Sequence, residues 1–261
     1  MRIKQAERNI RYSLLIYSLN NILKFIVRVV FVKCLPVEYL GINGLFSNVL
    51  ALLTLAELGV GQSIVYSLYK PLASDDTETI KLLMKLFKKA YIAIGCFIIA
   101  VGFFMIPWLE WFIKDNNISN LRLFYVIFLL NTGISYFYAY KRDIIIADQK
   151  QYINSIYQGM GQIILAVFQV VSLVVYESYL IYIALMLVIT MCENWMVARK
   201  ADKLYPYLRE SAAGCLSSDI YLKIKQNIKA MVGHRLGSVL VTSSPNIILS
   251  KFIGLSAIAV Y

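Results

Sequence analysis

Long apolar runs alternate with short polar segments along the whole chain. A helix rises about 1.5 Å per residue, so roughly 20 apolar residues are enough to cross the hydrocarbon core of a bilayer. The pattern predicts an all-α, polytopic helical membrane protein. Its expected spanning runs are residues Leu14–Val32, Gly41–Tyr69, Tyr91–Phe112, Leu121–Tyr140 and Ile153–Tyr176, a sixth from the tight turn at Glu177–Ser178 to Val197, and a seventh over about Ala230–Ile253.

The spacing of these runs predicts the domain organisation. Residues 1–198 are expected to form an N-terminal lobe of six transmembrane helices, and residues 199–229 a connecting loop. Residues 230–261 would then begin a second, truncated lobe with the seventh helix. We expect Pro107 to interrupt the third run, and Gly59 and Gly61 to allow bending or close packing in the second.

The polar segments suggest surface structure. Residues 1–12 are expected to lie on the membrane surface, and residues 141–151 to form a polar turn. Asp75 and Glu78 have the spacing of a capping box that opens a short amphipathic helix in the interface. Three lysines would share one face of that helix, namely Lys81, Lys85 and Lys88.

Composition and charge support the membrane interpretation. The chain is 59% hydrophobic and 16% charged, whereas soluble domains are typically about 25% charged. Its net charge of +11 comes from cations between the apolar runs, which indicates topology and contact with anionic lipids rather than nucleic acid. The N-terminal segment and alternate loops contain 19 Lys and Arg residues, against 3 in the other turns. This asymmetry predicts six crossings with the N-terminus in the cytoplasm.

The sequence gives little indication of metal or redox chemistry. The four cysteines lack C-x-x-C spacing and are interpreted as isolated small apolar residues. His234 is the single histidine, so a histidine-based ligand cluster is excluded. We expect His234 and Arg235 to lie at the membrane interface, at the start of the seventh helix.

The first apolar run contains a polar stripe. Asn20, Lys24 and Arg28 are spaced at i, i+4 and i+8, which places them along one face of a helix. A cation at bilayer depth costs at least about 2.5–3.5 kcal/mol on insertion scales. Two explanations remain open, because the stripe would either face a wet, protein-lined cavity or pair with a partner helix.

A weak internal repeat links the two ends of the chain. A shift of 218 residues places three polar residues of the seventh run over this stripe, namely Ser238, Thr242 and Asn246. Lys251 then falls over Lys33, and Pro245 is expected to interrupt the seventh helix. Broken polar helices at corresponding places in two halves are typical of a transporter's central site.

Two stretches carry a family resemblance. EYLGINGLFSNVLALLTLAELGVGQSIVYSLYKPLASDD, over Glu38–Asp76, resembles the early segment of bacterial polysaccharide (Wzx-type) flippases, relatives of the multidrug MATE exporters. NIILSKFIGLSAIAVY, over Asn246–Tyr261, is similar to the start of that family's second lobe. The resemblance implies two pseudo-symmetric lobes of twelve to fourteen helices around a central cavity. The chain supplies one lobe and one helix, so independent activity is in question.

The resemblance implies passage of an undecaprenyl-pyrophosphate-linked oligosaccharide across the bacterial cytoplasmic membrane. Lys24, and then Arg28, would contact the pyrophosphate, because cations bind an anion far better in a low-dielectric cavity than in water. Four amides would donate hydrogen bonds to sugar hydroxyls, namely Asn20, Asn21, Gln162 and Gln169. Glu57 would pair with Lys24 or Arg28, as a resting or a permanent partner, or bind a coupling cation.

Other partners and functions follow from the same expectation. No cofactor is expected, and the sequence leaves open whether a coupling ion or the membrane potential drives transport. Besides membrane lipids, partners would be polysaccharide-assembly enzymes and either a missing second lobe or a second copy. A MATE-like cation exporter would favour acidic residues, whereas the spans were expected to hold two cations and one acid. An enzyme is disfavoured because the sequence has no Gly-rich phosphate loop, no paired catalytic carboxylates and only short outer turns. An inactive truncated product remains an alternative.

Overall fold

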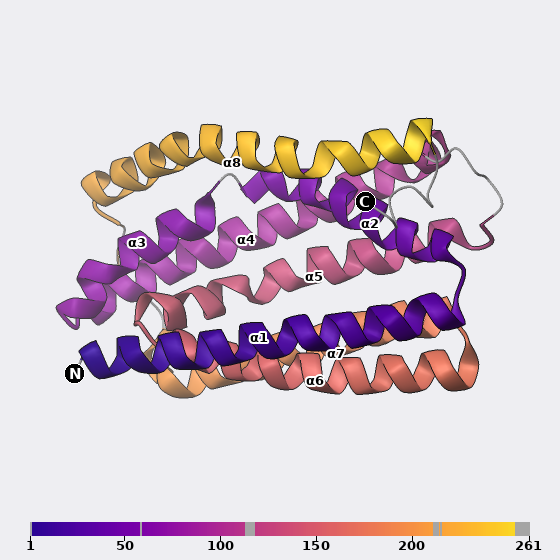
Figure 1. Ribbon diagram of the computed structural model, residues 1–261. Coiled ribbons are helices and arrows are strands. Elements are labelled where there is room, and N and C mark those ends of the chain that lie inside the picture. Colours follow the sequence, from indigo (N-terminus) through magenta and orange to yellow (C-terminus); the bar gives the residue numbers. More distant parts are fainter. Residues whose placement is uncertain (1, 58, 113–117, 211–213, 215, 254–261) are drawn as a thin grey trace.

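The computed structural model describes residues 2–57, 59–112, 118–210, 214 and 216–253, which form helices with no strand among them (Figure 1). The α-helices are α1 (Arg2–Cys34), α2 (Val37–Leu53), α3 (Val60–Ala73), α4 (Thr77–Met105), α5 (Leu121–Ala147), α6 (Gln151–Tyr176), α7 (Tyr179–Leu204) and α8 (Ser218–Phe252). Three 3-10 segments connect them, namely η1 (Thr54–Glu57), η2 (Ile106–Phe112) and η3 (Pro206–Arg209). The predicted all-α class is confirmed.

Six helices are long and apolar enough to cross a membrane, and they make the chain a multi-pass membrane protein. They cover Gln5–Cys34, Val37–Glu57, Thr77–Leu109, Leu121–Ala147, Gln151–Tyr176 and Tyr179–Leu204. These spans correspond in order to the first six predicted runs. Within the described residues α8 is not among them, although it is a 35-residue helix that continues through Pro245. The expected interruption at Pro245 is therefore not observed.

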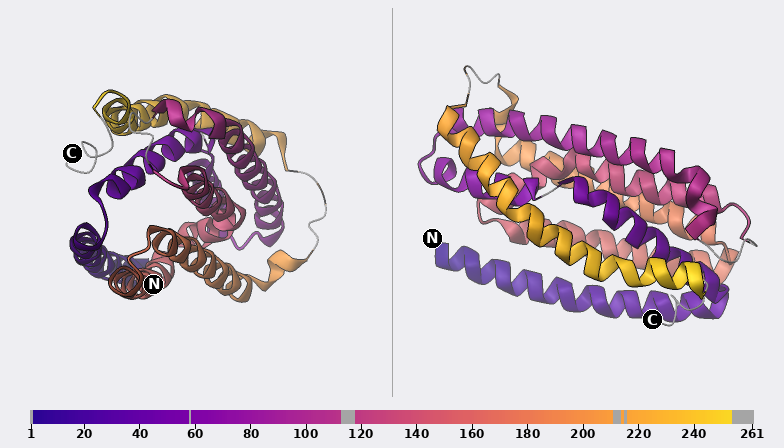
Figure 2. Two further views of the ribbon diagram at one scale, coloured as in Figure 1. Left: turned by 90° about the vertical axis from the view of Figure 1, so that its right-hand side faces the viewer. Right: turned by 90° about the horizontal axis from the view of Figure 1, so that it is seen from above.

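The helices pack along a common direction in one bundle. Helix α1 packs against α6, which packs against α7, while α5 lies between α7 and α4. Helix α8 covers α2 and α3 on the opposite side of the bundle from α1 (Figures 1 and 2). The interior is filled by large apolar side chains that are essentially inaccessible, including Phe31, Leu45, Phe46, Leu83, Phe87 and Tyr125.

The two ends of the bundle differ in their charge and contacts. At one end, which we call the basic end, the start of α1 meets the α5–α6 turn: the Asn9 side chain donates to the carbonyl of Gln149 at 2.8 Å and accepts from the Tyr152 amide at 2.9 Å. The α3–α4 turn, the end of α7 and the start of α8 also lie at this end (Figure 1). At the opposite end, the Lys251 ammonium on α8 lies 3.0 Å from the centre of the Trp111 ring.

Several predicted helix boundaries are wrong because an apolar stripe continues through polar sequence. Ile80, Leu83 and Phe87 are buried against the bundle, so residues 77–89 begin α4 instead of forming a separate interfacial helix. The cap is Asp76, whose carboxylate accepts from the hydroxyl and amide of Thr79, and these bonds lower the pKa of Asp76 below its usual range. Asp75 has a φ of 54° and lies outside the helix.

The same cause extends α5, and α1 is also longer than predicted. Ile144 and Ile145 are fully buried, so α5 continues to Ala147 and the predicted polar turn shortens to residues 148–150. Residues 2–12 continue α1 instead of forming a separate surface segment.

The second predicted run is divided into two helices. Helix α2 ends at Leu53, η1 follows, and α3 begins at Val60. Gly59 has a φ of 75°, a left-handed conformation that residues with a side chain rarely adopt, and it turns the chain between η1 and α3. The run therefore bends at Gly59, and Pro107 similarly lies in η2 just after the end of α4.

Candidate functional site

The predicted polar stripe lies on one side of α1. Asn21, Lys24 and Arg28 are exposed, whereas Asn20 is half-buried. The buried Asn20 Oδ1 has no hydrogen-bond partner among the described residues. Lys24 precedes the end of α1 by ten residues, or about 15 Å of helix rise, so it lies well inside the span.

The packing of α1 explains why the two cations are exposed. Helix α1 packs against α6, where Ile16 occupies the space left by the absent side chain of Gly159. Val27 and Phe31 mark the buried face of α1. At 100° per residue, Lys24 and Arg28 lie about 60° and 100° around the helix from Val27, outside the packed face. In the described part of the chain, Lys24 has no ion-pair partner.

A second polar group forms where η1 meets α3, α4 and α5. The Tyr91 hydroxyl donates to Asp143 Oδ2 at 2.6 Å, and the Tyr136 hydroxyl donates to Glu57 Oε2 at 3.2 Å. The two tyrosine rings are 6.1 Å apart between centroids. We call Glu57, Tyr91, Tyr136 and Asp143 the carboxylate–tyrosine cluster.

Gly61 makes room for this cluster. A methyl group built on Gly61 would lie 2.5 Å from the Tyr91 hydroxyl oxygen and 2.8 Å from Glu57 Oε1. Any side chain at position 61 would therefore displace these polar groups. Glu57 lies two residues before the left-handed Gly59, so a change in the bend between α2 and α3 would move Glu57 relative to Asp143. Two carboxyl groups beside two phenols are suited to hold a proton or a small cation between the helices.

An ion pair joins α5 and α7 through Arg142, the residue that precedes Asp143 of this cluster. Arg142 Nη2 lies 2.8 Å from Glu193 Oε1 and 3.0 Å from Asn194 Oδ1. Glu193 Oε2 would lie 3.0 Å from a methyl group on Gly161, so that glycine admits the carboxylate between α6 and α7.

Sequence reasoning missed this ion pair and Asp143. The local pattern predicts a polar turn at Arg142 and Asp143, and it hides Glu193 and Asn194 within an apolar run. Asp143 and Glu193 both lie on helices that are candidate spans, in addition to the one acid and two cations that the sequence analysis counts there. An acid followed by an amide inside an apolar run was the available signal, since such residues are rare there without a partner.

The structure does not bring all the predicted site residues together. Gln169 is buried, and its side-chain amide donates to the Tyr182 carbonyl at 3.3 Å, which joins α6 to α7. Gln162 is half-buried elsewhere on α6. The contact of Glu57 is with Tyr136, in a cluster separate from the stripe on α1. The side chains of His234, Arg235, Ser238, Thr242 and Asn246 lie outside the described residues, so the repeat is not tested.

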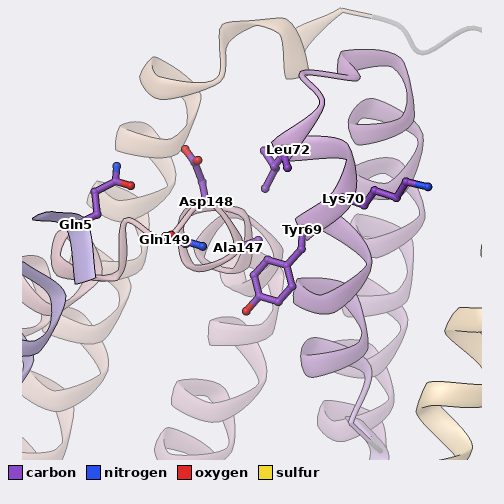
Figure 3. A pocket seen from close by; sticks show the side chains of 8 residues that line it. Gln5, Tyr69, Lys70, Leu72, Ala147, Asp148 and Gln149 are labelled. Atoms are coloured by element: carbon purple, nitrogen blue, oxygen red, sulfur yellow. The ribbon is translucent and has the colours of Figure 1, made fainter. Parts of the chain in front are cut away.

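Cavities occur at the basic end. One of about 420 Å³ lies between the start of α1, the end of α3 and the α5–α6 turn (Figure 3). Tyr69, Asp148 and Gln149 contribute its polar groups, and Lys70 points away from them. A second, of about 410 Å³, is rich in lysine and lies between α4, α5, α7 and η3. Among the described residues, no group of three or more His, Cys, Asp or Glu side chains is arranged to hold a metal ion.

Comparisons with known proteins give no further assignment. No protein-family model, curated protein or solved structure matches the chain. The fold and the candidate membrane-spanning helices therefore rest on the structure itself, and the function proposed below rests on the resemblance of residues Glu38–Asp76 together with the chemistry of the stripe on α1.

Proposed function

We propose that the chain forms a transporter lobe that moves a lipid-linked oligosaccharide pyrophosphate across the bacterial cytoplasmic membrane. In this proposal α1 and its stripe face a central cavity that a second lobe closes, supplied by more chain or by a second copy. The N-terminus and the basic end face the cytoplasm. Rocking of the two lobes would give the headgroup access to each side in turn.

The observation that supports the proposal is the position of Lys24 and Arg28. Both are exposed on a candidate membrane span, outside the face of α1 that packs against α6, and Lys24 lies ten and Arg28 six residues before the end of that helix. Contact with lipid tails would be costly for either cation. A water-filled cavity that receives an anionic headgroup removes this cost, and the low dielectric around the cavity strengthens the attraction to pyrophosphate.

The amides of α1 extend the same face. Asn21 is exposed beside Lys24, and Asn20 keeps an oxygen without a partner among the described residues. Asn21 would donate to sugar hydroxyls next to the pyrophosphate. Gln169 contributes to helix packing instead, because its amide already donates to Tyr182.

The test is a double substitution, Lys24→Ala with Arg28→Ala, in the native gene. We expect surface polysaccharide to fall at least tenfold while the protein stays in the membrane at normal abundance, and lipid-linked precursor to accumulate. Lys33→Ala is the matched control, because Lys33 is an exposed cation at the end of the same helix. Normal polysaccharide in the double variant would refute the cavity assignment.

A second candidate function is the export of organic cations, which the carboxylate–tyrosine cluster favours. Glu57 and Asp143 are acids inside spans, as a cation exporter requires. Substitutions Glu57→Gln and Asp143→Asn would then raise the cellular accumulation of ethidium. The flippase proposal instead predicts unchanged ethidium accumulation, so the measurement separates the two functions.

A further inference from the structure

We propose that the lysine-rich cavity between α4, α5, α7 and η3 is a binding site for a phosphate group at the membrane surface. The cavity has a volume of about 410 Å³, which is large enough for a phosphodiester headgroup. It lies at the basic end, away from the stripe on α1. Its cations are Lys81, Lys85, Lys88, Lys141 and Arg209, and its acids are Asp202 and Glu210.

Two of the five cations are already neutralised. Lys81, only 8% exposed, lies 2.7 Å from Glu210 and 2.9 Å from Glu78. Lys141 lies 2.6 Å from Asp202. These pairs fix the walls of the cavity, because they connect α4 to the segment after η3 and α5 to α7.

Three cations remain for a ligand. Lys85, Lys88 and Arg209 are exposed and line the cavity. None of them has an ion-pair partner in the part of the chain that the structure describes. Like charges repel one another when they line one small cavity, and a bound anion would relieve the repulsion. A guanidinium with two ammonium groups is suited to a phosphate, which offers several acceptor oxygens.

The position of the cavity favours a lipid as the source of the phosphate. The apolar part of α4 begins at Tyr91, three residues after Lys88, or about 4.5 Å along the helix. The cations therefore lie where the hydrocarbon region gives way to headgroups. A soluble phosphate compound would present the same chemistry from the aqueous side, so the experiment separates the two sources.

The experiment is native mass spectrometry of the delipidated protein. It is titrated with phosphatidylglycerol, with phosphatidylcholine as the zwitterionic comparison, and separately with inorganic phosphate. The variant combines Lys85→Gln, Lys88→Gln and Arg209→Gln. The control variant removes three exposed cations outside this cavity, through Lys203→Gln, Lys225→Gln and Lys229→Gln. Thermal unfolding of both variants verifies that they fold.

We expect phosphatidylglycerol to bind the native protein at least tenfold more tightly than phosphatidylcholine. The cavity variant should lose at least tenfold in that affinity, and the control variant less than threefold. If inorganic phosphate binds instead, with the same loss in the cavity variant alone, the site is supported with a soluble source. Equal losses in both folded variants, or no phosphate-dependent binding, would overturn the proposal.

Discussion

Arg142 on α5 and Glu193 on α7 lie 2.8 Å apart, nitrogen to oxygen, inside two neighbouring membrane spans. Asn194 accepts a second bond from the same guanidinium nitrogen at 3.0 Å. Side-chain exposures of 31% and 10% place the pair at the edge of the interior. The ion pair therefore stabilises the packing of α5 against α7.

Removing one partner of the Arg142–Glu193 pair should destabilise the bundle. Glu193→Ala leaves the Arg142 guanidinium without its carboxylate partner. The loss of one partner of a fully buried pair costs about 3–5 kcal/mol, and the cost is smaller here because Arg142 is 31% exposed. Thermal unfolding in detergent would show the lower midpoint. A joint replacement, Arg142→Met with Glu193→Leu, should recover most of the loss because no uncompensated charge remains.

An exposed ion pair provides the control for that measurement. Arg11 and Glu7 lie 3.4 Å apart on α1, and both side chains are exposed. Glu7→Gln should change the free energy of unfolding by less than about 1 kcal/mol. Equal effects of Glu193→Ala and Glu7→Gln would contradict the structural role assigned to the Arg142–Glu193 pair.

The close crossing of α4 and α5 should not tolerate a side chain at Gly95. A methyl group there would lie 3.1 Å from the backbone oxygen of Gly133 and 2.8 Å from Phe137 Cε1. Gly95→Ala should therefore separate the helices and cost about 1–3 kcal/mol in the free energy of unfolding. Gly237→Ala on α8 is the matched control, since no atom of the described residues lies within 4 Å of its added methyl group. That control should be neutral or slightly stabilising, because alanine favours helix. A stable Gly95→Ala protein would show that α4 and α5 pack less tightly.

The sequence was sufficient to predict the helical class and the six spans, because membrane crossing depends on the length and apolarity of local segments. It was less reliable at the ends of the helices. The local pattern predicts a separate interfacial helix at Lys81 and a polar turn at Lys141, whereas these residues lie on the long helices α4 and α5 and form ion pairs at the basic end. A local pattern does not show that Glu210 or Asp202 will be present to neutralise them.

The candidate site shows the same limit. The stripe on α1 could be predicted, since Asn20, Lys24 and Arg28 share one helix and their spacing fixes their relative direction. The carboxylate–tyrosine cluster could not, because Glu57 and Asp143 are 86 residues apart in the sequence. Their proximity depends on the left-handed turn at Gly59 and on how α3, α4 and α5 pack together.

Alkaline pH should weaken the bundle through Tyr205. This phenol is 4% exposed and donates to Asp148 Oδ2 at 2.7 Å. Burial, and then the bond to Asp148, raise the pKa of Tyr205 well above its usual range. The unfolded chain loses this proton near pH 10 and the folded protein loses it later. The contribution of the Tyr205 phenol to the free energy of unfolding is therefore complete below pH 10 and decreases as the pH rises further.

Unfolding midpoints between pH 8 and 11 would test this expectation. Tyr205→Phe should lower stability by about 1 kcal/mol at pH 8 through loss of the hydrogen bond. Above pH 10 the stability of Tyr205→Phe should decrease less steeply with pH than the stability of the native protein. Tyr221→Phe, at an exposed tyrosine on α8, should leave the pH profile unchanged. Parallel profiles for the native protein and Tyr205→Phe would contradict the expectation.

The Asn9 side chain should hold the start of α1 to the α5–α6 turn. Its amide nitrogen donates to the Gln149 carbonyl, and its oxygen accepts from the Tyr152 amide. The Arg8 guanidinium also lies 4.3 Å from the centre of the Tyr152 ring. Asn9→Ala removes both hydrogen bonds and leaves the first turn of α6 without its side-chain cap, which typically costs about 1 kcal/mol.

Hydrogen exchange in a lipid nanodisc would measure this attachment. In Asn9→Ala, amides of residues 150–156 and of the first turns of α1 should exchange faster, while the middle of α6 keeps its protection. Gln158→Ala is the control, because Gln158 is exposed on the same helix. Unchanged exchange over residues 150–156 would show that packing of α1 on α6, rather than the Asn9 hydrogen bonds, holds this end of the bundle. Faster exchange confined to those segments would identify Asn9 as the residue that fixes the N-terminal part of α1 at the basic end.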